Sequence, residues 1–165
     1  MPLDPDELGS LMATTPSHLW CALPSLAEVV PHGPPMLLLD EITSWDGQRV
    51  ECRLVPRADS PFVEAGRAPA TLAIEYMAQC IAVYGGLVAR ARGEPVSIGY
   101  LAGARDVTLV ADEFRVGEVL YVEAFHVWGD DALGSFACAV RRQGEVVAKG
   151  TLSAYRSGLR ANART

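Results

Sequence analysis

Apolar residues dominate one long stretch in the middle of the chain. Between Thr71 and Arg92 nearly every position is apolar or small, and only the last turn, with Arg90 and Arg92, is plainly polar. A helix that is apolar on all sides is typical of a protein core. Thr71 is suited to the N-cap position, and Gly93 followed by Pro95 predicts the C-terminal end. The pattern therefore predicts one long helix enclosed by the rest of the fold.

Alternation of apolar and polar positions predicts β-strands on both sides of this helix. A short helix over 25–30, capped by Ser25, comes first. The segments "MLLLDEITSW" and "RVECRLVP" then read as two strands joined by Asp46-Gly47, a strong hairpin signal, and 56–70 reads as a loop. The turns "VGE", "WGDDALG" and "RQGE" predict that the later strands form hairpins. These later strands are expected near 96–110, 118–128, 134–142 and 146–155.

The order of these elements predicts the fold. The chain order is two strands, one long buried helix and four further strands. One antiparallel sheet that curls around a single helix accounts for this order, and this is an α+β fold of the hot-dog type. The whole chain, 1–165, is expected to form one domain with a loose N-terminal segment, 1–20, and a frayed tail, 157–165. A curled sheet leaves an exposed edge, so we expect a dimer with an identical or a related chain.

Composition narrows the functional classes. The net charge of −6 over 165 residues argues against nucleic-acid binding and against binding to anionic membranes. The four cysteines are dispersed, with no CxxC pair, and the N-terminus lacks the regions of a signal peptide. No apolar run is expected to be long enough to span a bilayer. These features predict a cytoplasmic protein with reduced thiols and without a metal site.

Glu75 is the first candidate for chemistry, because it lies in the first turns of the apolar helix. A carboxylate in such surroundings needs a partner or a task. It either accepts backbone N–H groups at the helix start or serves as an acid or a water-positioning group. Apolar neighbours raise the pKa of such a carboxyl group and the helix terminus lowers it.

His32 is the second candidate. Pro31, Pro34 and Pro35 stiffen its loop and fix the direction of the imidazole, which prepares it for proton transfer. The alternative is a loop histidine that binds a backbone carbonyl. His126, in "YVEAFHVWG", is expected to be a partly buried structural residue on the strand face of Val122, Ala124 and Trp128. No GxSxG, phosphate-binding loop or HExxH motif is present.

Four segments resemble one known family. "VVPHGPPMLLLDEI", "LAIEYMAQ", "GYLAGAR" and "GSFACAV" are similar, in this order, to the β-hydroxyacyl–acyl-carrier-protein dehydratases. They are closest to the hot-dog branch encoded with aryl-polyene and related lipid or polyketide gene clusters, and the match covers roughly 23–156. The resemblance implies a dimer that dehydrates a 3-hydroxyacyl thioester carried on acyl carrier protein. It implies no cofactor beyond the phosphopantetheine arm of that carrier.

The resemblance also implies a site. Glu75 matches the family's helix glutamate, and Gln79 matches a glutamine one turn later, where it is expected to orient the Glu75 carboxyl group or the leaving water. The family's usual histidine before the helix is missing from "SPFVEAGRAPA", and His32 occupies the position of a second histidine close to the active site. We therefore expect His32 as the base and Glu75 as the acid. The residues expected to contact the substrate are Pro31, Gln79, Gly103 and Arg105.

Two alternatives remain open at this stage. The missing histidine motivates a non-catalytic or half-catalytic subunit that pairs with a related hot-dog dehydratase. A thioesterase, in which Glu75 activates water or attacks the thioester, is the other. Because acyl carrier proteins are acidic, a basic tunnel mouth is expected. Its candidate residues are Arg67, Arg90, Arg92 and Arg105.

Overall fold

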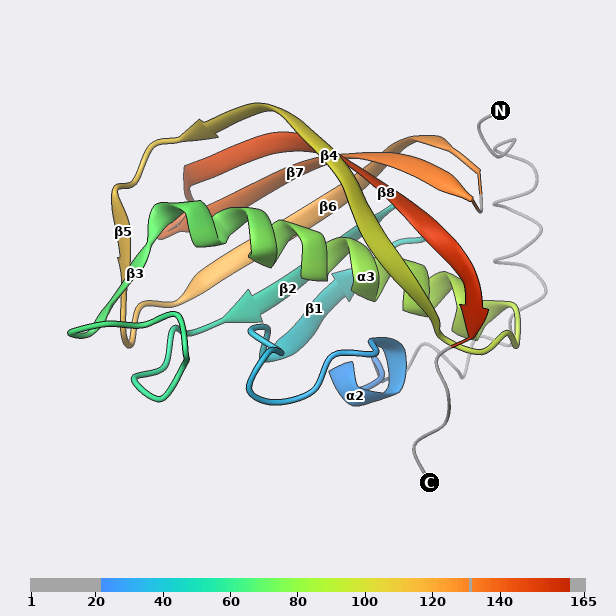
Figure 1. Ribbon diagram of the computed structural model, residues 1–165, viewed down its shortest axis with the longest axis horizontal. Coiled ribbons are helices and arrows are strands. Elements are labelled where there is room, and N and C mark those ends of the chain that lie inside the picture. The colour runs from blue at the N-terminus through green and yellow to red at the C-terminus, as the bar shows by residue number, and fades with distance from the viewer. Residues whose placement is uncertain (1–21, 131, 161–165) are drawn as a thin grey trace.

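A computed structural model describes residues 22–130 and 132–160 of the chain. The described elements are two α-helices, a 3₁₀ turn and eight strands (Figure 1). In chain order they are α2 (Leu26–Val29), β1 (Glu41–Trp45), β2 (Arg49–Leu54), β3 (Arg67–Pro69), η2 (Ala70–Leu72), α3 (Ala73–Ala91), β4 (Ser97–Leu109), β5 (Glu113–Arg115), β6 (Leu120–Gly129), β7 (Leu133–Arg142) and β8 (Glu145–Arg160). The predicted segment 1–20 lies outside the described residues, as does 161–165 of the predicted tail, whereas 157–160 belong to β8.

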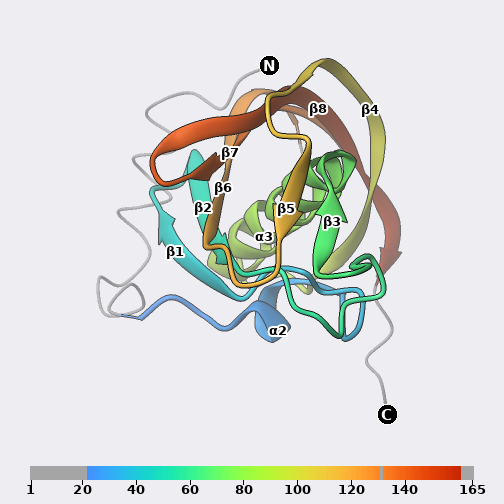
Figure 2. The ribbon, with the colours of Figure 1, turned by 90° about the vertical axis from the view of Figure 1, so that its left-hand side faces the viewer.

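Six strands form one antiparallel sheet in the order β1-β2-β6-β7-β8-β4. The sheet curls around α3, which Figure 2 shows from the end of the helix. Alternate residues of the central strands point toward the helix, so Val50 and Cys52 of β2 and Val122 and Ala124 of β6 are fully buried. Their apolar surface stabilises the fold by leaving water. The predicted hot-dog arrangement is confirmed.

Two predicted hairpins are confirmed. Asp46-Gly47 joins β1 to β2, where the Asp46 carboxylate accepts the N–H groups of Gln48 and Arg49 and Gly47 has a φ of 93°. "RQGE" joins β7 to β8 through two residues with positive φ, as a tight hairpin turn requires. "VGE" is different, because it links β6 to β5, which pairs with β3 in a separate ribbon. The predicted 56–70 loop therefore contains one short strand.

The start of α3 was predicted wrongly. Thr71 lies inside the 3₁₀ turn, the N-cap position is Leu72, and no side chain caps the helix. The N–H of Ala73, which a Thr71 cap would have bound through its side chain, donates instead to the carbonyls of Ala70 and Thr71. The 3₁₀ turn thus satisfies this donor through the backbone, and its own Ala70 N–H donates to the carbonyl of Asp112 at 3.2 Å.

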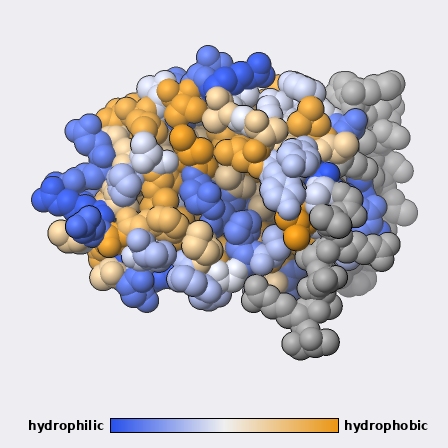
Figure 3. Space-filling view, in the orientation of Figure 1, coloured by the Kyte–Doolittle hydropathy of each residue, from blue (hydrophilic) through white to orange (hydrophobic). Residues whose placement is uncertain are grey.

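One stripe of α3 is not enclosed. Ile74, Ala78 and Ala82 are only partly buried and Gly85 is exposed, because none of the described elements covers that side of the helix. Figure 3 shows hydrophobic residues gathered on the face that carries α3 and β4. The described helical stretch Ala70–Ala91 is long and apolar enough to cross a membrane, which the sequence pattern had not indicated. However, 67% of its most apolar part is buried inside the fold, as in a core helix.

Candidate active site

Glu75 and Gln79 form a hydrogen-bonded pair at the start of α3. The Gln79 Nε2 donates to Glu75 Oε1 at 2.8 Å and to the Met36 carbonyl at 2.7 Å. The Gln79 Oε1 accepts the Leu38 N–H at 2.9 Å. Because a backbone donor lies on one side of the amide and a backbone acceptor on the other, the amide has one satisfied orientation. Gln79 is 1% exposed, so water does not replace these bonds.

This pair answers the question of whether Glu75 has a partner. One carboxyl oxygen is held by the amide of Gln79, and the side chain is only partly buried. The other oxygen has no hydrogen bond to any described residue. An oriented carboxyl group with one oxygen available is suited to exchange a proton with a ligand.

His32 and Glu75 are not joined by a hydrogen bond in the described part of the chain. No ion pair joins the two side chains there either, and the buried His32 Nδ1 has no hydrogen-bond partner among these residues. Pro31 and His32 are both partly buried in the loop between α2 and β1. Glu75 is therefore bonded to Gln79 and not to His32, the expected base.

Gly103 and Arg105 lie on β4, an edge strand of the sheet, and both are exposed. The pairing of β4 with β8 shifts register three times, and Asp106 adopts a positive φ of 53° at the last of these shifts. No hydrogen bond connects β4 with Glu75 within the described residues. Two of the other expected cations are already engaged, since Arg67 pairs with Glu113 and Arg90 pairs with Glu28.

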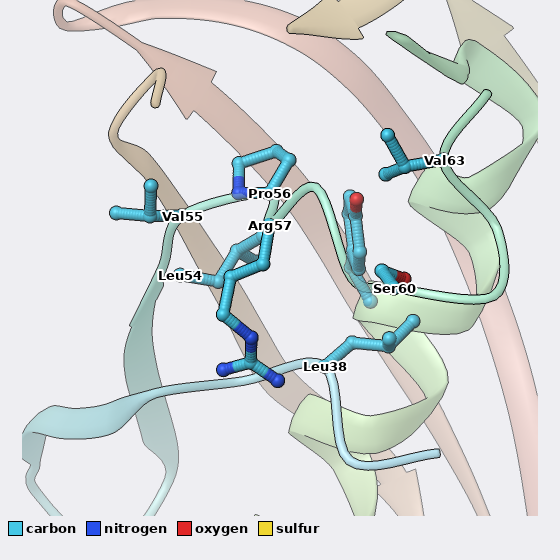
Figure 4. Close-up of a pocket in the computed structure, with 8 residues that line it drawn as sticks. Leu38, Leu54, Val55, Pro56, Arg57, Ser60 and Val63 are labelled. Atoms are coloured by element: carbon cyan, nitrogen blue, oxygen red, sulfur yellow. The ribbon is translucent and has the colours of Figure 1, made fainter. Parts of the chain in front are cut away.

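A small pocket lies against the loop that follows β2 and is lined by Tyr76, the residue after Glu75 (Figure 4). It has room for about one water molecule. Arg57 borders it and is held by Asp40 at 3.1 Å, and the Leu38 side chain forms one wall. Tyr76 also lines it, and burial raises the pKa of this phenol to about 12, so it stays a neutral donor. The lining residues are Leu38, Leu54, Val55, Pro56, Arg57, Ser60, Val63 and Tyr76.

Sequence reasoning missed the backbone of Met36 and Leu38 and the side chain of Tyr76. The first two were expected to lie in a strand, but β1 begins only at Glu41, and their polar backbone groups bind Gln79 instead. Only a buried glutamine one turn after Glu75 signalled that a second segment must supply its partners.

Burial keeps two cysteine thiols, Cys80 and Cys138, in the unreactive protonated form. Burial raises the pKa of Cys80 well above its usual value and raises that of Cys138 to about 12. Cys52 is also buried and free, and Cys21 lies outside the described residues. The nucleophilic form of a thiol is the thiolate, which burial disfavours at Cys80 and Cys138.

His126 packs as a structural residue. Its ring stacks on Tyr84, with centroids 5.6 Å apart, and meets the edge of Phe136. It shares the inner face with Val122 and Ala124 but not with Trp128, because a register shift between His126 and Trp128 turns the tryptophan outward. The predicted shared face was therefore wrong at one position.

The surroundings of His126 predict a pH-dependent stability. Burial lowers its pKa in the folded state, so the neutral ring is favoured there. The unfolded chain then binds more protons just below the ordinary value of about 6.5, and stability falls as the pH drops through that value. Urea unfolding at pH 7.5 and 5.5 should show a smaller loss for His126→Phe than for the native sequence. An equal loss in both proteins would contradict this.

Comparison with known proteins finds one family and several similar structures. A family model described as "ApeP-like: ApeP dehydratase" matches residues 24–163. A chain in the structure of the dehydratase heterocomplex ApeI:P from Xenorhabdus doucetiae is 31% identical in sequence to this chain. The match covers 83% of this chain and 93% of that chain, with a TM-score of 0.80. No curated protein matches the chain.

More distant structures share only the fold. A hypothetical thioesterase with coenzyme A from Streptococcus pneumoniae TIGR4 is 19% identical over 73% of this chain and 87% of its own, with a TM-score of 0.53. The uncharacterized protein PH1136 from Pyrococcus horikoshii is 13% identical over 86% of this chain and 100% of its own, with a TM-score of 0.60.

Proposed function

The chain belongs to the ApeP-like dehydratase family, and we propose that it takes part in dehydrating a 3-hydroxyacyl thioester carried on acyl carrier protein. The product is the trans-2-enoyl thioester. The observation that carries the proposal is the Glu75 carboxyl group, held through one oxygen by the buried amide of Gln79 and available through the other. No cofactor is needed, because the substrate arrives on the phosphopantetheine arm of its carrier.

The elimination needs an acid and a base. The base removes a proton from the carbon next to the thioester carbonyl, and the electron pair forms the new double bond as the C–O bond of the 3-hydroxyl group breaks. Glu75, in its protonated form, gives its proton to the departing hydroxyl group, which leaves as water. Developing charge on the thioester oxygen requires a hydrogen-bond donor. Gln79 keeps the carboxyl group in one orientation throughout.

The base has two candidate sources. His32 belongs to the same chain but makes no hydrogen bond to Glu75 among the described residues, and the segment 56–70 contains no histidine. A second hot-dog chain is the other source, and we favour it. The similar ApeI:P dehydratase is a heterocomplex, which supports a heterodimer here.

The edge of β4 suits such a partner. The sheet has two outer strands, and β1 spans only five residues with a bulge between Ile42 and Ser44. β4 spans thirteen residues, and its Tyr100 and Leu101 are 45% and 44% exposed. An exposed edge with apolar side chains is a template for pairing with another strand.

The test is dehydration by the chain alone and by the chain co-expressed with a related hot-dog dehydratase. Mass spectrometry of a 3-hydroxyacyl–carrier-protein substrate should show loss of water with the pair and little or none with the chain alone. His32→Ala should leave the activity of the pair largely intact. Full activity of the chain alone, abolished by His32→Ala, would assign the base to His32 instead. Release of free acid in place of the enoyl product would identify a thioesterase and overturn the proposal.

A further inference from the structure

Helix α2 lies against α3 at Gly86, with no side chain between the two backbones. A Cβ atom at Gly86 would lie 1.8 Å from the carbonyl oxygen of Val29 and 2.6 Å from its carbonyl carbon. Both are backbone atoms, so rotation of a side chain does not relieve the contact. A Cβ atom at the adjacent Gly85 would meet nothing within 4 Å. A side chain at position 86 therefore moves α2 away from α3.

Helix α2 is firmly attached to the core. Leu26 and Val29 are 6% and 0% exposed, and Glu28 forms an ion pair with Arg90 of α3 at 3.4 Å. A shift of α2 consequently displaces the segment that follows it. We call this segment, residues 30–38, the strap.

The strap is fastened to α3 a second time, at Gln79. The backbone of Met36 and that of Leu38 bind the two ends of the Gln79 amide. Gly86 lies seven residues after Gln79, which is about 10 Å along a helix. The strap thus runs beside α3 from the Gly86 contact to the residue that orients Glu75.

The strap is stiff between its two attachments. Pro31, Pro34 and Pro35 have fixed φ angles. The N–H groups of Met36 and Leu37 both donate to the carbonyl of Gly33, at 2.9 and 3.1 Å, and close a turn. A stiff segment transmits a displacement from one end to the other instead of absorbing it.

We propose that Gly86 is a positioning residue for Glu75. Its missing side chain lets α2 dock, the docked α2 sets the strap, and the strap holds the Gln79 amide that orients the Glu75 carboxyl group. This inference rests on the proposed function for its effect on catalysis, but the mechanical coupling from Gly86 to Gln79 is independent of it.

The matched pair Gly86→Ala and Gly85→Ala tests the effect on catalysis, in the complex that dehydrates the carrier-bound substrate. Both changes favour the helix equally. A displacement of about 1 Å in a catalytic group costs up to about 100-fold in rate, so kcat should fall roughly 10- to 100-fold in Gly86→Ala, with a smaller change in KM. Gly85→Ala should stay within about twofold. Because Gly86 acts through Gln79, Gly86→Ala combined with Gln79→Met should be no slower than Gln79→Met alone.

Amide exchange measured by NMR tests the coupling without any activity. The Leu38 N–H is protected by its bond to Gln79, so it should exchange faster in Gly86→Ala and unchanged in Gly85→Ala. Leu26→Val removes part of a buried side chain of α2, so it weakens the attachment of α2 to the core and should have the same effect. This second variant provides the test if Gly86→Ala does not fold. Native exchange at Leu38 in both folded variants would overturn the inference. Altered exchange in a complex that dehydrates nothing would refute the proposed function alone.

Discussion

Glu75→Gln should remove nearly all dehydratase activity while the protein remains folded. Glutamine keeps the shape of the side chain, and its carbonyl oxygen still accepts the hydrogen bond from Gln79 Nε2. It has no acidic proton to give to the departing hydroxyl group. Loss of a general acid lowers kcat by about 10²- to 10⁴-fold. Mass spectrometry of the acyl carrier protein, with the partner chain present, measures the remaining rate.

The control for this variant is Glu145→Gln, which makes the same chemical change at an exposed position at the start of β8. Its activity and its urea unfolding should match those of the native protein. Native activity in Glu75→Gln would show that Glu75 is not the acid and would remove the central step of the proposed mechanism.

Gln79→Glu should be the most damaging change to stability near the site. The new carboxylate would face the Met36 carbonyl and the Glu75 carboxyl group, and it has no proton to donate to either. Gln79 is 1% exposed, so water does not compensate. An unpaired buried charge costs about 3–5 kcal/mol of unfolding free energy. Activity should be lost as well, because Glu75 is no longer held.

The loss should depend on pH. Burial and the neighbouring carboxyl group favour the protonated form of Glu at position 79, which raises its pKa in the folded state. The folded variant then binds more protons than the unfolded chain above the ordinary value of about 4.3, so its stability falls as the pH rises. Urea unfolding at pH 5 and pH 8 should show the larger loss at pH 8. Gln79→Met, similar in size but uncharged, should show an equal loss at both.

Local patterns in the sequence were sufficient for the main elements. Asp46-Gly47 and "RQGE" specify tight hairpins through residues that tolerate positive φ, and the apolar run of α3 specifies a core helix. Their order leaves little choice of topology, and the hot-dog fold followed from it. The start of α3 did not follow, because the 3₁₀ turn Ala70–Leu72, whose Ala70 N–H donates to the distant Asp112 carbonyl, takes the place of a side-chain cap.

The sequence by itself also singled out Glu75, because a carboxylate in an apolar helix is costly without a partner. Gln79, one turn later, was expected to orient that carboxylate, and only the tertiary structure decided how the Gln79 amide is itself held. The Gln79 amide is oriented by backbone groups of Met36 and Leu38, more than forty residues earlier, and every residue carries such groups, so no side-chain pattern marks them. No sequence pattern indicates the close approach of the α2 backbone to Gly86 either. Such contacts depend on how the folded segments pack, which periodicity along the chain does not encode.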